Sequence, residues 1–139
     1  MLIYTVGTWD LLHVGHIALL QYCKSLGGTV AVGVASDEVV ASYKINRPVI
    51  PLDQRMEVLK ALRCVDIVRP YYELEYTSAC RDLGTDIFVI GEDWGKAPHN
   101  LDVESFLKNA GKSIVQVEYH PQTSSTKIKK TIAQLHAVA

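Results

Sequence analysis

The sequence predicts an α/β fold, with an open, mainly parallel sheet of five strands and helices on both faces. Three observations indicate this class. Short runs rich in β-branched residues alternate with segments of helical periodicity. The strand-like runs are almost wholly apolar, as strands covered on both faces are. Parallel strands also need a crossover connection, and the helix-length segments supply one.

The first three elements are clear in the sequence. Residues 2–6 (LIYTV) form a nearly continuous apolar strand that Gly7 ends. Over residues 15–26, apolar side chains recur at the spacing of a helix, and Gly27 with its neighbouring glycine stops it. Residues 29–35 (TVAVGVA) are a second buried strand.

The second half repeats the alternation after a loop. Residues 43–52 contain two prolines and no helical period, so they predict a loop. A helix is expected over residues 53–62, with Asp53 as its N-cap and an apolar face. The remaining strands are expected at residues 65–68, 86–90 and 113–118, and the remaining helices at about 74–83, 102–109 and 124–135. This order is Rossmann-like, and ligands of such sheets bind beyond the carboxyl ends of the strands.

Composition narrows the class of protein. The 139 residues fit one domain, 1–139, with a core of its own. Lys plus Arg number 14 against 15 for Asp plus Glu, which argues against a nucleic-acid partner. No apolar stretch approaches 18 residues, so no membrane partner is expected. Cys23, Cys64 and Cys80 suit reduced thiols, and with no leader-like start the expected location is cytoplasmic.

The segment with most chemical information is GTWDLLHVGH, residues 7–16, which turns the first strand into the first helix. A helix N-terminus presents free N–H groups and partial positive charge, which suits a phosphate. Gly15 lets a ligand approach the backbone closely. His13 and His16 lie three residues apart, so both can face one ligand and donate imidazole N–H bonds to it.

Three other interpretations of the two histidines stay open on the residues alone. They could cap the helix and fill a polar pocket. Together with Asp10 they could bind a metal ion, although no remote fourth ligand of the expected type stands out. The segment could also be only a tight turn between a strand and a helix.

The same segment resembles the GTFDLLHxGH signature of the cytidylyltransferases, within the HxGH nucleotidyltransferase superfamily. The resemblance continues through Arg55, RCVD at 63–66, GEDW at 91–94 and SSTKIK at 124–129, and it covers about residues 2–132 in the same order. GEDW and SSTKIK look closest to the glycerol-3-phosphate cytidylyltransferases, whose signatures are GDDW and RTEGISTTKIK.

This resemblance implies that CMP passes from CTP to a small phosphomonoester, in a homodimer. His13 and His16 would bind the triphosphate and stabilise the transition state, with Lys44 and Arg47 on a loop over the phosphates. Mg²⁺ would be the cofactor, carried by the nucleotide phosphates, with Asp10 as the candidate protein ligand and no protein-only metal site. Further nucleotide contacts are implied at Thr8, Trp9, Gly15, Glu92, Asp93, Trp94, Gln122, Thr123, Ser124, Ser125 and Thr126.

The implied acceptor is glycerol-3-phosphate or a related alcohol phosphate, bound by Asp10, Arg55, Arg63 and Asp66. The two arginines are eight residues apart on a predicted helix, so they face similar directions. Arg63, just before a strand, would grip the acceptor phosphate with both arms of its guanidinium and act in catalysis. The alternative is a solvent-facing helix surface, with Asp66 as a polar group at the start of the strand.

The chain departs from the glycerol-3-phosphate pattern in two places. Residues 121–126 (PQTSST) are shorter than RTEGISTT and lack its arginine, which leaves room for ATP. Residues 71–77 (YYELEYT) lack the tryptophan and lysine near glycerol phosphate, so another polyol or amino-alcohol phosphate stays open. The alternatives are an ATP-using adenylyltransferase, such as the archaeal FAD synthetases or heptose-phosphate enzymes, and a nucleotide-binding protein without turnover. The charged run Lys127, Lys129 and Lys130 is expected mainly to face solvent.

Overall fold

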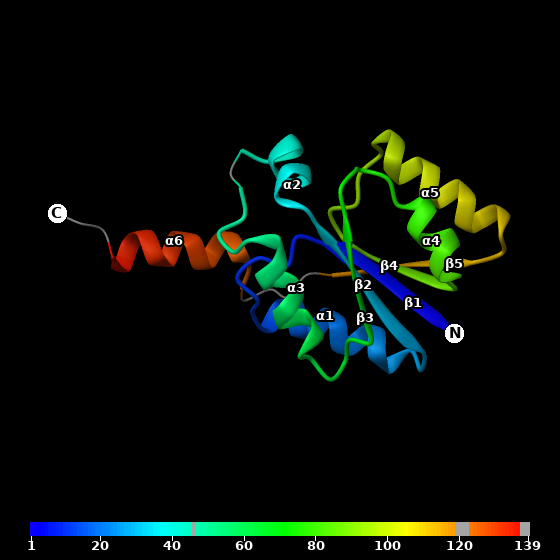
Figure 1. Ribbon diagram of the computed structural model, residues 1–139, viewed down its shortest axis with the longest axis horizontal. Coiled ribbons are helices and arrows are strands. Elements are labelled where there is room, and N and C mark those ends of the chain that lie inside the picture. Colours follow the sequence, from blue (N-terminus) through cyan, green and yellow to red (C-terminus); the bar gives the residue numbers. More distant parts are fainter. Residues whose placement is uncertain (46, 119–122, 137–139) are drawn as a thin grey trace.

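The computed structural model describes residues 1–45, 47–118 and 123–136. Within them, five parallel strands form one sheet in the order β3-β2-β1-β4-β5 (Figure 1). Their bounds are β1 Leu2–Gly7, β2 Thr29–Ala35, β3 Ile67–Tyr71, β4 Ile87–Gly91 and β5 Ser113–Val117. The predicted open parallel sheet is thereby confirmed.

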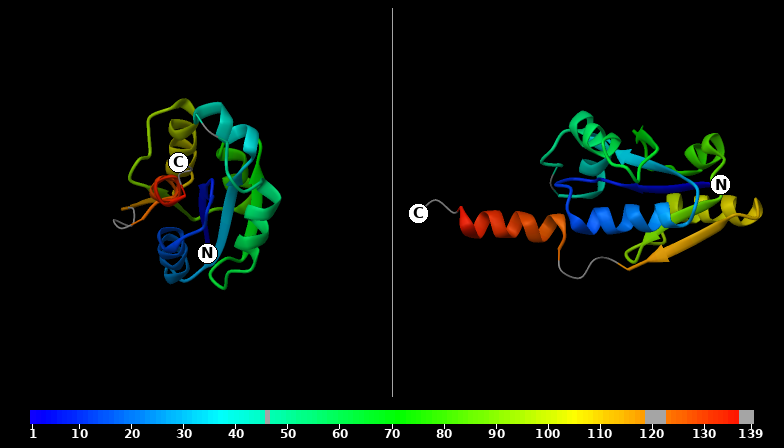
Figure 2. Two further views of the ribbon diagram at one scale, coloured as in Figure 1. Left: turned by 90° about the vertical axis from the view of Figure 1, so that its left-hand side faces the viewer. Right: turned by 90° about the horizontal axis from the view of Figure 1, so that it is seen from below.

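Six helices accompany the sheet in the described part of the chain. They are α1 Val14–Ser25, α2 Asp37–Tyr43, α3 Leu52–Lys60, α4 Thr77–Leu83, α5 Pro98–Asn109 and α6 Ser125–Leu135. Helices α1 and α3 cover one face of the sheet, and α4 and α5 cover the other (Figure 2). Helix α6 extends away from the sheet, beyond the end where β1 meets α1 (Figure 1).

The pleat of the strands divides the core into two layers. Successive side chains of a strand point to opposite faces. Ile3 and Val30 therefore pack with α1 and α3, while Tyr4 and Ala31 pack with α4 and α5. Each fully buried side chain of this size contributes about 1.5–3 kcal/mol relative to exposure. This packing holds the strand ends, and the loops that leave them, in fixed places.

The strand order places a ligand crevice beside β1. The chain moves from β1 to β2 and β3 on one side, then returns to place β4 on the other side of β1. Connections therefore leave the carboxyl ends of β1 and β4 in opposite directions and open a crevice between them. The segment after β1 is the one with the two histidines, so the fold puts it at this crevice.

Several boundaries differ from the sequence predictions. Helix α2 was not predicted, although Ser36 caps it by accepting the N–H of Val39. Helix α3 begins at Leu52, and its N-cap is Pro51 rather than Asp53. Helix α4 begins three residues later than predicted and α5 four residues earlier.

Strand β3 also begins later than predicted and continues through Pro70. A proline lacks the N–H that a central strand would need, and it is tolerated here because β3 is an edge strand. None of the described helices combines the length and the apolar character needed to cross a membrane.

Candidate functional site

The turn between β1 and α1 has an unusual backbone. Trp9 and Leu11 have φ values of 59° and 49°, in the left-handed region, which costs a residue other than glycine roughly 1–2 kcal/mol. The indole of Trp9 is buried, and its N–H donates to the Gly33 carbonyl at 3.0 Å. The nucleotide contact expected of Trp9 is therefore left to its backbone N–H and stays a prediction. The indole anchors the strained turn in the core.

The two histidines lie side by side at the start of α1. His13 is the N-cap, and its Nδ1 accepts the Gly15 N–H at 3.0 Å. His16 lies one turn later, and its Nδ1 accepts the His13 N–H at 3.1 Å. The ring centroids are 3.9 Å apart, with an angle of 32° between the planes. The structure thus brings together His13, Gly15 and His16, as the sequence predicted.

These bonds decide where the imidazole protons lie. A nitrogen that accepts a hydrogen bond carries no proton, so a neutral ring of this kind carries its proton on Nε2. Burial and the adjacent His13 lower the pKa of His16 to about 4, with Asp10 opposing the shift. At neutral pH His16 is therefore a neutral donor with a fixed tautomer. The same imidazoles thus cap the helix through Nδ1 and carry an N–H donor at Nε2.

Asp10 organises the surrounding loops. Its side chain is 4% exposed, and its two carboxylate oxygens accept the N–H groups of Val49 at 2.8 Å and Ile50 at 3.0 Å. Its backbone carbonyl accepts the hydroxyl of Ser125 at 2.7 Å. Both oxygens are thus engaged by backbone N–H groups of the protein, and the acceptor contact expected of Asp10 stays a prediction.

Helix α6 begins close to this turn. Ser124 caps it by accepting the Lys127 N–H at 3.0 Å, and Ser125 reaches the carbonyl of Asp10. The N-terminus of α6, with its unpaired N–H groups, therefore lies beside the turn that leads into α1. Thr123 is half-buried and Thr126 is exposed in the same segment. Gln122 lies outside the described residues.

Two lysines interact electrostatically with the carboxylate of Asp10. The ammonium of Lys129, on α6, lies 3.6 Å from Asp10 Oδ2. Lys44 follows α2, and its pKa is lowered by partial burial and by Lys129, with Asp93 and Asp10 opposing. Cations from α6 and from the end of α2 thus gather near the two histidines. Arg47 and Glu92 are exposed on neighbouring loops.

Arg55 has a structural environment that the sequence did not predict. The residue is 1% exposed, and its guanidinium donates to the carbonyls of Thr8, Ala35 and Ile50. It also forms an ion pair with Asp37 at 2.6 Å. A guanidinium so enclosed offers little surface to an acceptor phosphate, so the structure does not support the acceptor role expected of Arg55.

Arg63 and Asp66 lie near the amino ends of β2 and β3, at the opposite end of the strands from the two histidines. Helix α3 ends at Lys60, so Arg63 is on the turn that leads into β3, and it is exposed. Asp66 Oδ2 accepts the Val30 N–H at 2.9 Å and binds the Lys24 ammonium at 2.8 Å. Lys24 is in the last turn of α1, whose twelve residues span about 18 Å. Within one chain, both residues are therefore far from the histidines, and their acceptor roles are not supported.

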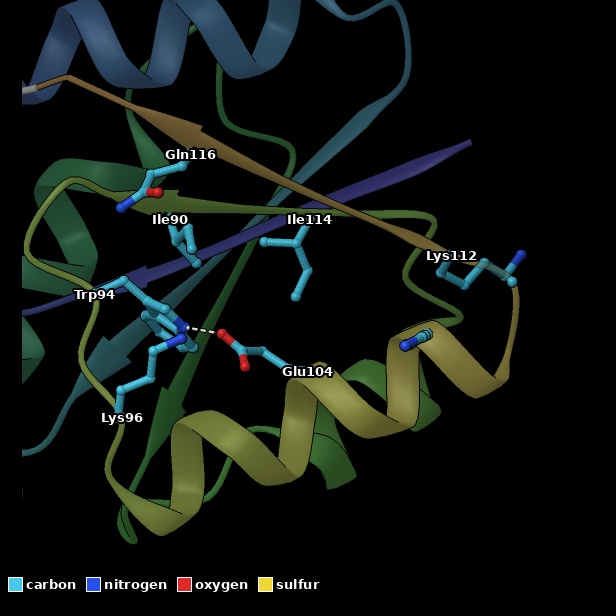
Figure 3. A pocket seen from close by; sticks show the side chains of 9 residues that line it. Ile90, Trp94, Lys96, Glu104, Lys112, Ile114 and Gln116 are labelled. Atoms are coloured by element: carbon cyan, nitrogen blue, oxygen red, sulfur yellow. Dashed lines mark hydrogen bonds between the residues drawn. The ribbon is translucent and has the colours of Figure 1, made fainter.

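Trp94 also lies elsewhere than expected. Its indole N–H donates to Glu104 on α5 at 2.7 Å (Figure 3). Its ring packs against Phe88 and Tyr76. It forms one wall of a pocket with Ile90, Ile114 and Gln116, between α5 and the strands β4 and β5 (Figure 3). The side chain of Trp94 therefore packs on the α5 face rather than beside a nucleotide.

The described residues contain no group of three or more His, Cys, Asp or Glu side chains that could hold a metal ion. The interpretation of His13, His16 and Asp10 as a metal site is further weakened by their hydrogen bonds. Both Nδ1 atoms and both Asp10 oxygens accept backbone N–H groups.

Sequence reasoning missed Lys129, which it placed mainly in solvent. A signal was present: Ser125 and Lys129 are four residues apart, so they lie on one face of the helix. If Ser125 faces the site, Lys129 faces it too. The buried role of Arg55 had no comparable signal, because it depends on three carbonyl groups from segments far apart in the sequence.

Comparisons with known proteins found a family model and relatives that match most of this chain. The family model described as cytidylyltransferase-like matches residues 4–131. A FAD synthase of Thermococcus sibiricus is 33% identical over 134 residues, covering 96% of this chain and 90% of that protein. A FAD synthase of Thermococcus onnurineus is 35% identical, with 93% and 87% covered. The bifunctional protein HldE of Streptomyces coelicolor is 38% identical, but the match spans only 27% of its length.

Solved structures share the fold. A lipopolysaccharide core biosynthesis protein from Thermoplasma volcanium superposes with a TM-score of 0.68 at 23% identity, over 86% of this chain and 96% of that one. A pantoate–β-alanine ligase from Francisella tularensis gives a TM-score of 0.54 at 16% identity, over 99% and 72%. At these identities the likeness concerns the fold alone. The narrower likeness to the glycerol-3-phosphate enzymes stays a prediction.

Proposed function

Because the chain belongs to the cytidylyltransferase-like family, we propose that it transfers CMP from CTP to a small phosphomonoester. The products are a CDP-alcohol and pyrophosphate, and the preferred acceptor is glycerol-3-phosphate or a related alcohol phosphate. The observation that carries the proposal is the histidine pair. Two stacked imidazoles with Nε2 protons stand at the N-terminus of α1, beside the N-terminus of α6.

The chemistry fits residues that donate rather than accept protons. The second pKa of a phosphomonoester is near 6, so the acceptor is already an anionic nucleophile at neutral pH and needs no general base. Its oxygen forms a bond to the α-phosphorus while the bond from that phosphorus to the β-phosphate oxygen breaks. Negative charge then builds on the five-coordinate phosphorus and on the leaving pyrophosphate.

In this scheme each residue has a distinct role. His13 and His16 donate Nε2–H bonds to phosphate oxygens at the reacting phosphorus. Lys44, Lys129 and the N-terminus of α6 neutralise the pyrophosphate end, with Arg47 on the loop above it. One well-placed donor of this kind stabilises a transition state by roughly 3–4 kcal/mol in comparable sites.

Mg²⁺ is proposed as the cofactor and would arrive bound to the triphosphate. It keeps several waters and needs few protein ligands when phosphates supply the rest. Asp10 is not proposed as a ligand, because both of its oxygens accept backbone N–H groups. A homodimer is proposed from the resemblance, and a gel-filtration mass of one chain would contradict it.

Adenylyl transfer from ATP is the second candidate. It is favoured by relatives named FAD synthase that match along nearly their whole length. The GEDW segment favours CTP through its resemblance to the glycerol-3-phosphate enzymes. The observations that favour ATP and those that favour CTP differ only in the nucleotide base they indicate. The chemistry at the phosphates is the same for both nucleotides.

The test is pyrophosphate release with magnesium and either CTP or ATP. The acceptors are glycerol-3-phosphate, other alcohol phosphates, a heptose phosphate and flavin mononucleotide. The proposal predicts fastest release with CTP and an alcohol phosphate. Faster release with ATP would replace it with the adenylyl alternative. Nucleotide binding by calorimetry without release from any acceptor would identify a binding protein instead.

A further inference from the structure

Arg55 has the largest side chain that is fully buried among the described residues. Its Nη1 donates to the carbonyls of Thr8 at 2.6 Å and Ala35 at 2.8 Å, and its Nε donates to the carbonyl of Ile50 at 2.8 Å. These three carbonyls belong to the turn after β1, the end of β2, and the loop before α3. One side chain therefore ties together three connecting segments.

The buried charge has a specific chemical requirement. A desolvated cation is costly unless ion pairing and hydrogen bonds compensate it. The ion pair with Asp37 supplies the counter-charge, and the planar guanidinium can reach several acceptors in fixed directions. Lysine has the same charge but no fork, so it cannot make these bonds together.

Both backbone polar groups of Ile50 are hydrogen-bonded to side chains. Its carbonyl accepts from Arg55 Nε, while its N–H donates to Asp10 Oδ1. The neighbouring N–H of Val49 donates to Asp10 Oδ2. Asp10 in turn belongs to the turn whose Thr8 carbonyl is bound by Arg55. The loop of residues 47–51 is thus fastened to the turn that leads into the two histidines.

We propose that Arg55 is a positioning residue. With Asp10 it fixes residues 47–51 against the histidine turn, and it thereby sets where Arg47 and the neighbouring Lys44 stand relative to the phosphates. Arg55 touches no substrate. This consequence for substrates rests on the proposed nucleotidyl transfer, whereas the fastening of the loop does not.

The fastening is tested without any ligand, by amide hydrogen exchange in Arg55→Lys. The expected result is that the amides of Val49 and Ile50 exchange at least about tenfold faster, as for the loss of hydrogen bonds to a charged group. Core amides, such as that of Val32, change only as far as global stability does. The matched control is Arg69→Lys, which makes the same change at an exposed ion pair with Asp82. Equal acceleration at all these amides would overturn the proposal.

A second variant keeps the test valid if Arg55→Lys does not fold. Asp10→Asn leaves the buried arginine in place, but one amide group cannot accept from both the Val49 and the Ile50 N–H. It is expected to accelerate exchange of the same two amides. Where both single variants fold, the double variant should accelerate exchange less than the product of the two single effects, because they act on one loop. If the effects of the two single variants multiply in the double variant, the proposal that both residues hold the same loop is overturned.

Steady-state kinetics separates positioning from acceptor binding. In Arg55→Lys the KM for the nucleotide should rise about tenfold, as expected when a charge-assisted contact is lost. The KM for the acceptor phosphate should stay within about twofold. A rise confined to the acceptor KM would overturn the proposal. If wild-type protein shows no turnover, the proposed function fails, while the exchange result still decides whether Arg55 fastens the loop.

Discussion

The Nδ1 of His16 accepts the backbone N–H of His13, with 3.1 Å between the nitrogens. The Nδ1 of His13 likewise accepts the N–H of Gly15. Each ring therefore accepts one of the N–H groups at the start of α1. This relationship fixes both rings and leaves Nε2 as the nitrogen that carries the proton in each neutral imidazole. A helix start and a phosphate site are therefore built from the same two side chains.

Replacing His16 tests its chemical role. In His16→Ala the transfer rate is expected to fall at least about 100-fold, because one donor to the transition state is lost. The fold should persist, with a stability loss of about 1 kcal/mol from the missing cap. Initial rates and circular dichroism check both expectations. His136→Ala, at the exposed end of α6, is the control and should keep the wild-type rate. A His16→Ala rate within a few-fold of wild type would contradict the assignment.

The pH dependence of stability follows from the lowered pKa of His16, about 4 against 6.5 when unfolded. Between these values the unfolded chain binds more protons, so stability falls as the pH drops from about 6.5 towards 4. The contribution of this residue is at most about 3 kcal/mol. Urea unfolding at pH 7.5 and pH 5 measures it. The pH-dependent loss should be smaller in His16→Ala; an equal loss in both proteins would refute this origin.

Two lysines of α6 offer a matched pair for nucleotide binding. Lys129 lies near Asp10, while Lys130 is exposed on another face of the helix. Lys129→Ala is expected to weaken nucleotide affinity about tenfold, and Lys130→Ala less than about threefold. Calorimetric titration with the magnesium complex of the nucleotide is the measurement. Equal losses would indicate that only the overall charge of the helix matters.

Asp66 is expected to stabilise the fold without serving the nucleotide. The hydrogen bonds of its carboxylate with Lys24 and with the Val30 N–H lower its pKa. Asp66→Asn should cost about 1 kcal/mol of unfolding free energy. The cost is present above pH 4 and disappears as the pH falls, because the wild-type carboxylate is then protonated. Nucleotide affinity should not change, and a tenfold loss of affinity would contradict the placement of Asp66 at the amino ends of the strands, away from the histidines.

The fold was predictable because its signals are local. The apolar runs of β1 and β2 and the glycines that follow α1 mark their own boundaries. Helix α2 was not predicted because its seven residues are fewer than the stretch over which helical periodicity becomes clear. Its cap, Ser36 before two acidic residues, was nevertheless present in the sequence. Strand β3 was misplaced because only tertiary pairing shows that its proline lies at an edge.

The site was predictable to the extent that it lies on one continuous segment. His13, Gly15 and His16 are neighbours in sequence, so their meeting follows from helix geometry. The surroundings of Arg55 and Arg63 could not be predicted, because the burial and direction of a long side chain depend on distant segments. The same holds for Trp9 and Trp94, whose indoles satisfy their N–H groups inside the protein. Residue type alone does not distinguish a core role from a contact with ligand.

The most direct test of the central claim is a crystal structure with magnesium and a nucleotide whose α,β-bridging oxygen is replaced by a methylene group. The account predicts Nε2 of both His13 and His16 within hydrogen-bond distance of phosphate oxygens, with Nδ1 still bound to the backbone. A nucleotide held elsewhere, or imidazoles turned away from every phosphate group, would contradict it.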